Sequence, residues 1–211
     1  MTAKPSAARE RLLAAAARTF YAEGIHAVGV DRVIEQAQVT RATFYRHFPG
    51  KDDLVRAYVE AADADIRARL AAAQAVTADP YRLLGLCVEG IGEDICAPGF
   101  RGCPFINAAA EFPDPDHPVH RAVVTHRAWF RDALAGLLTT IGYADPQLGA
   151  DTLVMLRDGA MVAGYLGSPD AARANLRAAA SAMFPARTAV LMSARRRAAV
   201  LRRPAALPCG A

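Results

Sequence analysis

Apolar residues recur every three or four positions along most of this chain, which is the period of an amphipathic α-helix. The first such segment runs from about residue 6 to residue 23, with Ser6 as a candidate N-cap and Gly24 as a candidate stop. Its apolar face carries Leu12, Leu13, Ala16 and Phe20. The strict alternation of a half-buried β-strand is absent from the sequence. The pattern therefore predicts an all-α fold.

Proline and glycine divide the rest of the chain into further helices, about nine in total. Two short helices are expected at residues 30–36 and 40–47, with Thr40 as an N-cap and Pro49-Gly50 after the second. The longer segments that are expected to be helical are 52–76, 80–97, 104–112, 119–142, 147–166 and 170–184.

The three N-terminal helices have the pattern of a helix-turn-helix, whose last helix enters the major groove of DNA. Apolar residues of the second and third helices are expected to pack on the first helix: Val33, Ile34, Val39, Phe44 and Phe48. The outward face then carries Thr40, Arg41, Thr43, Tyr45, Arg46 and His47. Arginine, hydroxyl, phenol and imidazole groups supply the donors that phosphates and base edges accept. A solvated helical corner is the alternative interpretation.

The run from Thr40 to Leu54, Thr-Arg-Ala-Thr-Phe-Tyr-Arg-His-Phe-Pro-Gly-Lys-Asp-Asp-Leu, resembles the TetR family of bacterial repressors. The family's Tyr-x-x-Phe pair and its Lys-acid-x-Leu helix start are matched at Tyr45, Phe48, Lys51, Asp52 and Leu54. The resemblance implies that Thr40, Arg41 and Thr43 begin the reading helix, while Tyr45, His47 and Lys51 hold phosphates. Gly29 departs from the family, because many members carry a hydroxyl residue there that caps the second helix.

The resemblance implies a cytoplasmic homodimer that binds a palindromic operator in double-stranded DNA, most simply a repressor released by an unknown small-molecule effector. It is not expected to be an enzyme or to carry a cofactor. Residues 1–50 are expected to form the DNA-binding domain, and residues 51–185 a ligand-binding and dimerisation domain. Residues 186–211 form a basic tail, either a docked helix or a solvated arm.

Dimerisation is expected to use the last two helices of the larger domain, where small residues would allow a partner helix to approach closely. The candidate interface residues are Leu153, Leu156, Ala160, Ala163, Gly164, Gly167, Leu176 and Met183. Packing inside one protomer is the alternative.

The segment from Gly102 to Glu111 resembles a Gly-Cys-x-x-x-Asn-x-x-x-Glu pattern found in a subset of the family, some of which sense oxidants or electrophiles through that cysteine. Arg101 and a helix start would both favour the thiolate of Cys103. A structural or pocket-lining role is the alternative. Asn107 and Glu111 either line a pocket or satisfy each other and nearby backbone groups. Candidate apolar walls of a ligand pocket are Phe105, Phe112, Trp129, Phe130 and Tyr165.

A different class of function is suggested by the cluster of Glu111, His117 and His120, because two histidines with a carboxylate can hold a catalytic metal. Prolines interrupt the cluster, and a solvated loop is the alternative. This hypothesis would make the chain a metal-dependent helical enzyme, although the sequence shows neither a phosphate-binding glycine loop nor a nucleophile elbow.

Charge and composition agree with a DNA-binding interpretation. Residues 1–50 hold seven Lys/Arg against four acids, and residues 186–211 hold six arginines and no acid. Basic ends around an acidic centre suggest that a polyanion meets the ends. No apolar run approaches the roughly 20 residues that a membrane span needs, and the N-terminal run lacks a secretory cleavage site. Neither a membrane partner nor a disulfide framework is expected.

Overall fold

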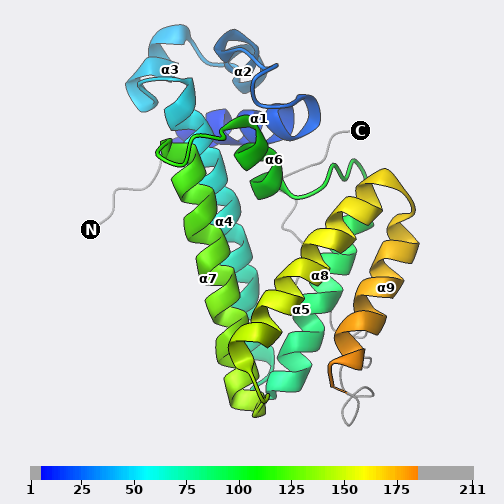
Figure 1. Cartoon of the computed structure of the whole chain (residues 1–211). Helices are drawn as coiled ribbons and strands as arrows, with labels where there is room; N and C mark the ends of the chain where they lie inside the picture. The colour runs from blue at the N-terminus through cyan, green and yellow to red at the C-terminus, as the bar shows by residue number, and fades with distance from the viewer. Residues whose placement is uncertain (1–5, 185–211) are drawn as a thin grey trace. The chain divides into compact units, whose positions relative to one another are not determined.

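The computed structural model describes residues 6–184, so the prediction for the basic tail 186–211 lies outside the described residues. Over residues 6–184 the chain forms nine α-helices and no β-strand, which confirms the predicted all-α fold. Figure 1 shows the helices in chain order. None of the helices in this range is both long and apolar enough to cross a membrane.

The first three helices are short, and local chemistry sets their ends. They are α1 (Ala7–Glu23), α2 (Val30–Ala37) and α3 (Arg41–His47). The hydroxyls of Ser6 and Thr40 accept the backbone N–H of Arg9 and Thr43, at 3.3 and 3.1 Å, and so cap α1 and α3. Gly29 at the N-cap of α2 provides no side-chain hydrogen bond.

The six later helices are α4 (Lys51–Val76), α5 (Pro80–Ile95), α6 (Pro104–Glu111), α7 (Pro118–Ile141), α8 (Pro146–Leu166) and α9 (Pro169–Ala182). All but α4 begin with proline, whose missing N–H is not needed in the first turn of a helix. Asp79, Asp145 and Ser168 cap α5, α8 and α9 through their side chains.

The described residues form two compact units whose boundaries differ from the predicted domain boundary at residue 50. The first unit contains residues 6–64 and 104–124, and the second contains residues 65–103 and 125–184. Thus α6 and the start of α7 belong with the three N-terminal helices. The sequence pattern could not indicate this, because the link is made by Glu111 to residues 25 and 26, far away along the chain.

The core of the first unit is built from apolar faces of α1 to α4. Leu12 and Phe44 are fully buried, and Phe20 and Phe48 are each 3% exposed. The rings of Phe20 and Tyr58 meet edge to face with centroids 6.0 Å apart, which joins α1 to α4. Gln38, with φ of 52°, ends α2 in the left-handed conformation and turns the chain toward α3.

In the second unit α5, α8 and α9 pack side by side (Figure 1). Gly164 allows this close approach, because a Cβ at that position would lie 2.4 Å from the side chain of Ile95. The carboxylate of Glu89, only 2% exposed, pairs with Arg177 at 2.5 Å and Arg173 at 3.1 Å. Two guanidinium groups of α9 thus neutralise a buried charge of α5, which makes this contact specific.

Gly24 follows the end of α1 and Gly29 precedes the start of α2. Replacing each by serine should change the free energy of unfolding in opposite directions. Gly29 has φ of −76° and open space around a Cβ, so Gly29→Ser adds a helix cap and should raise the free energy of unfolding by about 0.5 kcal/mol. Gly24 has φ of 96°, so Gly24→Ser should lower it by about 1–3 kcal/mol. Chemical denaturation measures both changes, and a stabilising Gly24→Ser would contradict this account of the corner.

Candidate functional site

The outward face of α3 exists because two phenylalanines on its opposite side are buried. Phe44 is fully buried and Phe48 is 3% exposed, with ring centroids 6.0 Å apart. The guanidinium of Arg9 lies 5.4 Å from the centre of the Phe48 ring and covers it from α1. These contacts fix the rotation of α3 about its own axis.

The seven residues predicted to contact DNA all lie on α3 or next to its ends, and none is buried. Exposed residues are Thr40, Arg41, Tyr45 and Arg46, and half-buried residues are Thr43, His47 and Lys51. Tyr45 leaves half of its surface in solvent, although its ring packs edge to face on Phe44 at 5.1 Å. The phenol is therefore held by the core and presented outward.

Some of these residues also hold the domain together. Thr40 caps α3, and Nε2 of His47 lies 3.1 Å from Oγ of Ser6. Nζ of Lys51 lies 3.5 Å from the carbonyl oxygen of His26, to which it donates. These contacts set the start of α4 and the end of α3 against the N-terminal part of the unit.

Arg41 forms an ion pair with Asp31 of α2. Both side chains are well exposed, at 64% and 74%, so the pair is screened by water and salt and adds little stability. The guanidinium of Arg41 is therefore accessible to solvent and only weakly held by Asp31.

Glu111, the last residue of α6, binds the corner between α1 and α2. Its carboxylate accepts the backbone N–H groups of Ile25 at 2.8 Å and His26 at 2.5 Å, and it lies 3.3 Å from Nδ1 of His26. Gly24 has φ of 96°, a conformation that leaves the two following N–H groups facing one acceptor. One carboxylate thus accepts hydrogen bonds from two consecutive backbone N–H groups of this turn.

Aromatic stacking extends this contact into the loop before α7. The ring of Phe112 lies between His26, at 5.0 Å, and His117, at 4.6 Å, measured between ring centroids. Nε2 of His117 lies 3.3 Å from Oδ2 of Asp52 at the start of α4. The end of α6, the corner after α1 and the first turn of α4 therefore form one connected cluster.

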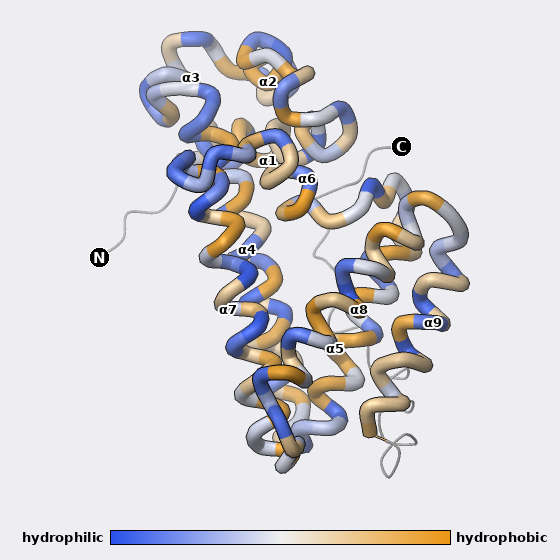
Figure 2. Tube along the Cα trace, in the orientation of Figure 1, coloured by the Kyte–Doolittle hydropathy of each residue, from blue (hydrophilic) through white to orange (hydrophobic). Residues whose placement is uncertain are grey.

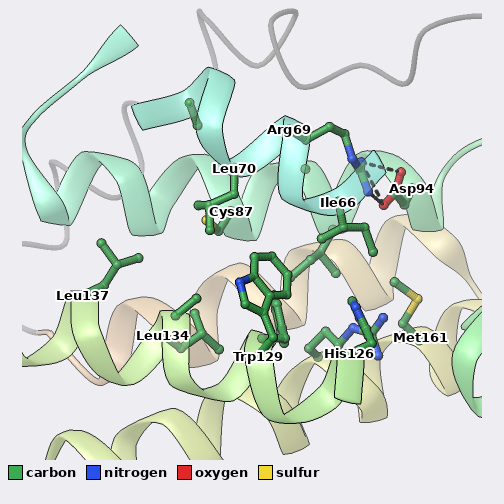
Figure 3. A pocket seen from close by; sticks show the side chains of 16 residues that line it. Ile66, Arg69, Leu70, Cys87, Asp94, His126, Trp129, Leu134, Leu137 and Met161 are labelled. Carbon is green, nitrogen blue, oxygen red and sulfur yellow. Dashed lines mark hydrogen bonds and ion pairs between the residues drawn. The ribbon is translucent and has the colours of Figure 1, made fainter. Parts of the chain in front are cut away.

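The second unit contains a cavity of about 80 Å³ between α4, α5, α7 and α8. Its apolar lining comprises Ile66, Leu70, Ala73, Cys87, Gly90, Ile91, Trp129, Phe130, Ala133, Leu134, Leu137 and Met161. Its charged or ionisable lining comprises Arg69, Asp94, His126 and Arg157. Figure 3 shows Leu137, Leu134 and Leu70 toward one end, Trp129 in the middle, and His126 with the Arg69–Asp94 pair toward the other.

The thiol that lines the cavity is held protonated, whereas the pKa of Arg157 is raised. Burial raises the pKa of Cys87 to about 11, even though the nearby Arg69 acts to lower it, so the thiol is protonated at neutral pH. Arg157 is 7% exposed, and it lies beside Cys103 and Asp158. Burial acts to lower the pKa of Arg157, but these neighbours raise it above its usual value.

Comparisons with known proteins agree with this helix-turn-helix. A family model for bacterial regulatory proteins of the tetR family matches residues 12–58. A solved TetR-family transcriptional regulator from Streptomyces coelicolor, SCO4454, is 47% identical, with a TM-score of 0.78 over 90% of this chain and 95% of that one. The chain belongs to the TetR family of transcriptional regulators.

Two curated relatives extend the likeness. The HTH-type transcriptional regulator YjdC of Escherichia coli is 25% identical over 161 residues, which are 72% of this chain and 81% of the relative. The HTH-type transcriptional regulator LmrA of Bacillus subtilis is 27% identical over 116 residues, 54% of this chain and 62% of the relative. TetR-family regulators bind DNA and act as dimers, so this regulator is a DNA-binding protein and not an enzyme.

Of the predicted ligand-binding residues, the cavity brings together only Trp129 and Phe130. Cys103 and Phe105 are 2% and 1% exposed and belong to other parts of the core. Asn107 is exposed, Glu111 and Phe112 form the cluster with His26, and Tyr165 is 47% exposed on α8. The expectation that Glu111 lines a pocket is therefore not met, because its carboxylate is occupied by backbone donors.

The predicted dimer residues divide into two groups. Leu153, Ala160, Gly164 and Leu176 are buried within their own protomer, and Leu156 and Met183 are half-buried. Ala163 and Gly167 are exposed. Figure 2 shows that α8 is apolar over much of its length. The exposed apolar side chains of α8 are Leu148, Met155, Val162, Tyr165 and Leu166. Leu148, Met155 and Val162 are seven residues apart and so share one face, which we call the outer face of α8.

The proposed metal ligands do not converge. Glu111 binds the amides of residues 25 and 26, His117 contacts Asp52, and Nδ1 of His120 lies 2.7 Å from the carbonyl oxygen of Phe112. Between residues 6 and 184 no three His, Cys, Asp or Glu side chains are placed to hold a metal ion. Each of these side chains instead joins chain segments of the first unit.

The cavity residues that sequence reasoning missed are polar groups on apolar helix faces. His126 lies in register with Val119, Val123 and Phe130 on α7, and Arg157 is the one basic residue of α8. The sequence did mark these two residues, because each is a charged or ionisable side chain at a helix position where the 3.6-residue period predicts an apolar one. Periodicity alone could not distinguish a cavity from a filled core, since only side-chain packing decides whether space remains.

The cluster around Glu111 predicts a local effect of mutation. Glu111→Ala leaves two backbone N–H groups without their acceptor and should lower the free energy of unfolding by about 1–3 kcal/mol. Glu111→Gln keeps one acceptor oxygen and should lose less. Hydrogen exchange of the Ile25 and His26 amides reports the contact directly, and Ala110→Ser, an exposed change on the same helix, is the control. Unchanged protection of both amides in Glu111→Ala would refute the contact.

Proposed function

We propose that this TetR-family regulator binds a palindromic operator as a homodimer and is released from it by a small molecule that occupies the cavity of the second unit. The observation that carries the proposal is the burial of Phe44 and Phe48, which leaves Arg41, Thr43 and Arg46 on the free face of α3. An Arg41 or Arg46 contact with guanine would discriminate by about 1–3 kcal/mol. Tyr45, His47 and Lys51 would hold phosphates.

The effector part of the proposal rests on the cavity. It combines an apolar lining with a few polar groups, which is the usual character of a small-molecule site. Its wall includes α4, the helix that also starts at Lys51 beside the reading helix. A ligand that fits only one placement of α4 would shift the balance between DNA-binding and non-binding states by its differential affinity for them.

Covalent sensing through Cys103 is the alternative predicted from the sequence. Arg157 lies beside Cys103, but the cysteine side chain is 2% exposed, so an electrophile reaches it only after local opening. The thiol that does line the cavity, Cys87, is held protonated by burial. These two facts favour a ligand that binds without forming a covalent bond.

Selection from random duplex DNA tests the proposal, because a dimer should recover a palindrome with a defined half-site spacing. Tyr45→Ala should then weaken binding to the selected site roughly tenfold, since it removes a hydroxyl that would donate a hydrogen bond to a DNA phosphate. Tyr45→Phe isolates the hydroxyl, and circular dichroism checks the fold of both variants. Gel shifts measure the affinity. Full binding by Tyr45→Ala would mean that this face of α3 does not contact DNA.

We propose that the outer face of α8 is the centre of the dimer interface. Ala163, Gly167 and neighbouring residues of α9 would extend this interface. Val162 is 51% exposed, so Val162→Glu should not disturb the protomer but would bury a charge between partners. We expect mainly monomer by sedimentation at micromolar concentration. Val124→Glu, at a valine that is 53% exposed on α7, is the matched control and should remain dimeric. Dissociation by both variants or by neither would exclude this face.

A further inference from the structure

The polar end of the cavity has an uneven distribution of charge between its two walls. On one wall, Arg69 of α4 donates to both carboxylate oxygens of Asp94, at 3.1 to 3.2 Å, and also lies 3.5 Å from Asp65. The acidic side chain that lines the cavity is therefore already occupied by a two-pronged guanidinium contact. A cationic ligand would have to displace that contact to reach Asp94.

On the other wall, two guanidinium groups share one carboxylate. Arg157 and Arg127 each lie 2.7 Å from an oxygen of Asp158, which stays ionised because both hydrogen bonds outweigh the effect of burial on its pKa. The other polar neighbour that raises the pKa of Arg157 is Cys103. Arg157 lines the cavity and is 7% exposed, whereas the side chain of Arg127 is 37% exposed, so the guanidinium that borders the cavity shares its counter-ion with one that faces solvent.

The rest of the lining at this end adds an imidazole and aromatic surface. His126, 3% exposed, lies between this wall and the aromatic residues, with its ring 6.3 Å from Phe130 and 5.9 Å from Trp129. The guanidinium of Arg157 is 5.8 Å from the centre of the Phe130 ring. Beyond Trp129 the lining is aliphatic, with the protonated Cys87 thiol among it (Figure 3).

From this arrangement, and resting on the proposed function of the cavity as the effector site, we propose that the effector is a small organic monocarboxylate with an apolar body. The carboxylate pairs with Arg157 beside His126, and the body fills the space between Trp129 and Leu137. A buried guanidinium that shares its counter-ion gains most from an added anion, because charge-assisted hydrogen bonds are strong where water is excluded. An uncharged or cationic head group offers no such gain.

Trp129 is the only tryptophan of the chain and lines the cavity, so its fluorescence reports binding without DNA. Three probes share one ring and differ in charge: benzoate, benzamide and benzylamine. We expect benzoate to quench Trp129 and to raise the melting temperature, benzamide to bind at least tenfold more weakly, and benzylamine to bind least. Equal or tighter binding of benzamide or benzylamine would overturn the proposal.

Two variants test the assignment to Arg157 with opposite expected signs. Arg157→Gln should weaken benzoate binding at least tenfold and leave benzamide binding nearly unchanged. Asp158→Asn removes the competing carboxylate and should strengthen benzoate binding several-fold. A general loss of folding cannot produce weaker binding in one variant and tighter binding in the other. Arg56→Gln, an exposed change on α4, is the control. A shift of benzoate affinity in the same direction in Arg157→Gln and Asp158→Asn would overturn the assignment.

Gel shifts with the selected operator separate this inference from the proposed function. Benzoate that binds in the expected order but leaves DNA bound would support the ligand class and contradict effector-driven release. Release of DNA by benzamide or benzylamine without release by benzoate would support a ligand-responsive regulator and contradict the carboxylate.

Discussion

The proposed DNA-contact face of α3 depends on the burial of Phe44 and Phe48. Two aromatic rings, separated by one helical turn, can be removed from water only if α3 turns that side toward α1. The opposite side, with Arg41, Thr43 and Arg46, must then face outward. The outward direction of this face is thus a consequence of packing, and the surface ion pair of Arg41 with Asp31 adds little to it.

Paired charges inside the second unit serve two different purposes. Glu89 is matched by two arginines of α9 and specifies how α5 and α9 meet. Asp158 also receives two arginines, but one of them, Arg157, lines a cavity. The same pairing of two arginines with one carboxylate therefore joins two helices at one site and borders a cavity at the other. This difference follows from the empty space beside Arg157, and not from the residue types involved.

Glu111 shows how a spacing pattern can indicate importance without indicating a role. Its position four residues after Asn107 suggested a pocket or a local hydrogen-bond partner, and its proximity in sequence to His117 and His120 suggested a metal. The carboxylate instead accepts two amides more than eighty residues earlier in the chain. Likewise, Gly164 was expected at a dimer interface, but it permits the approach of α5 within the same protomer.

The sequence by itself determined the helices, their ends and the outward face of α3, because each depends on residues within about one helical turn: caps, prolines, and apolar positions at a period of 3.6. The tertiary structure alone decided the partners of Glu111, the membership of α6 in the first unit, and the cavity with His126 and Arg157. These features join residues far apart along the chain, and no local pattern records which side chains will meet or where space will remain.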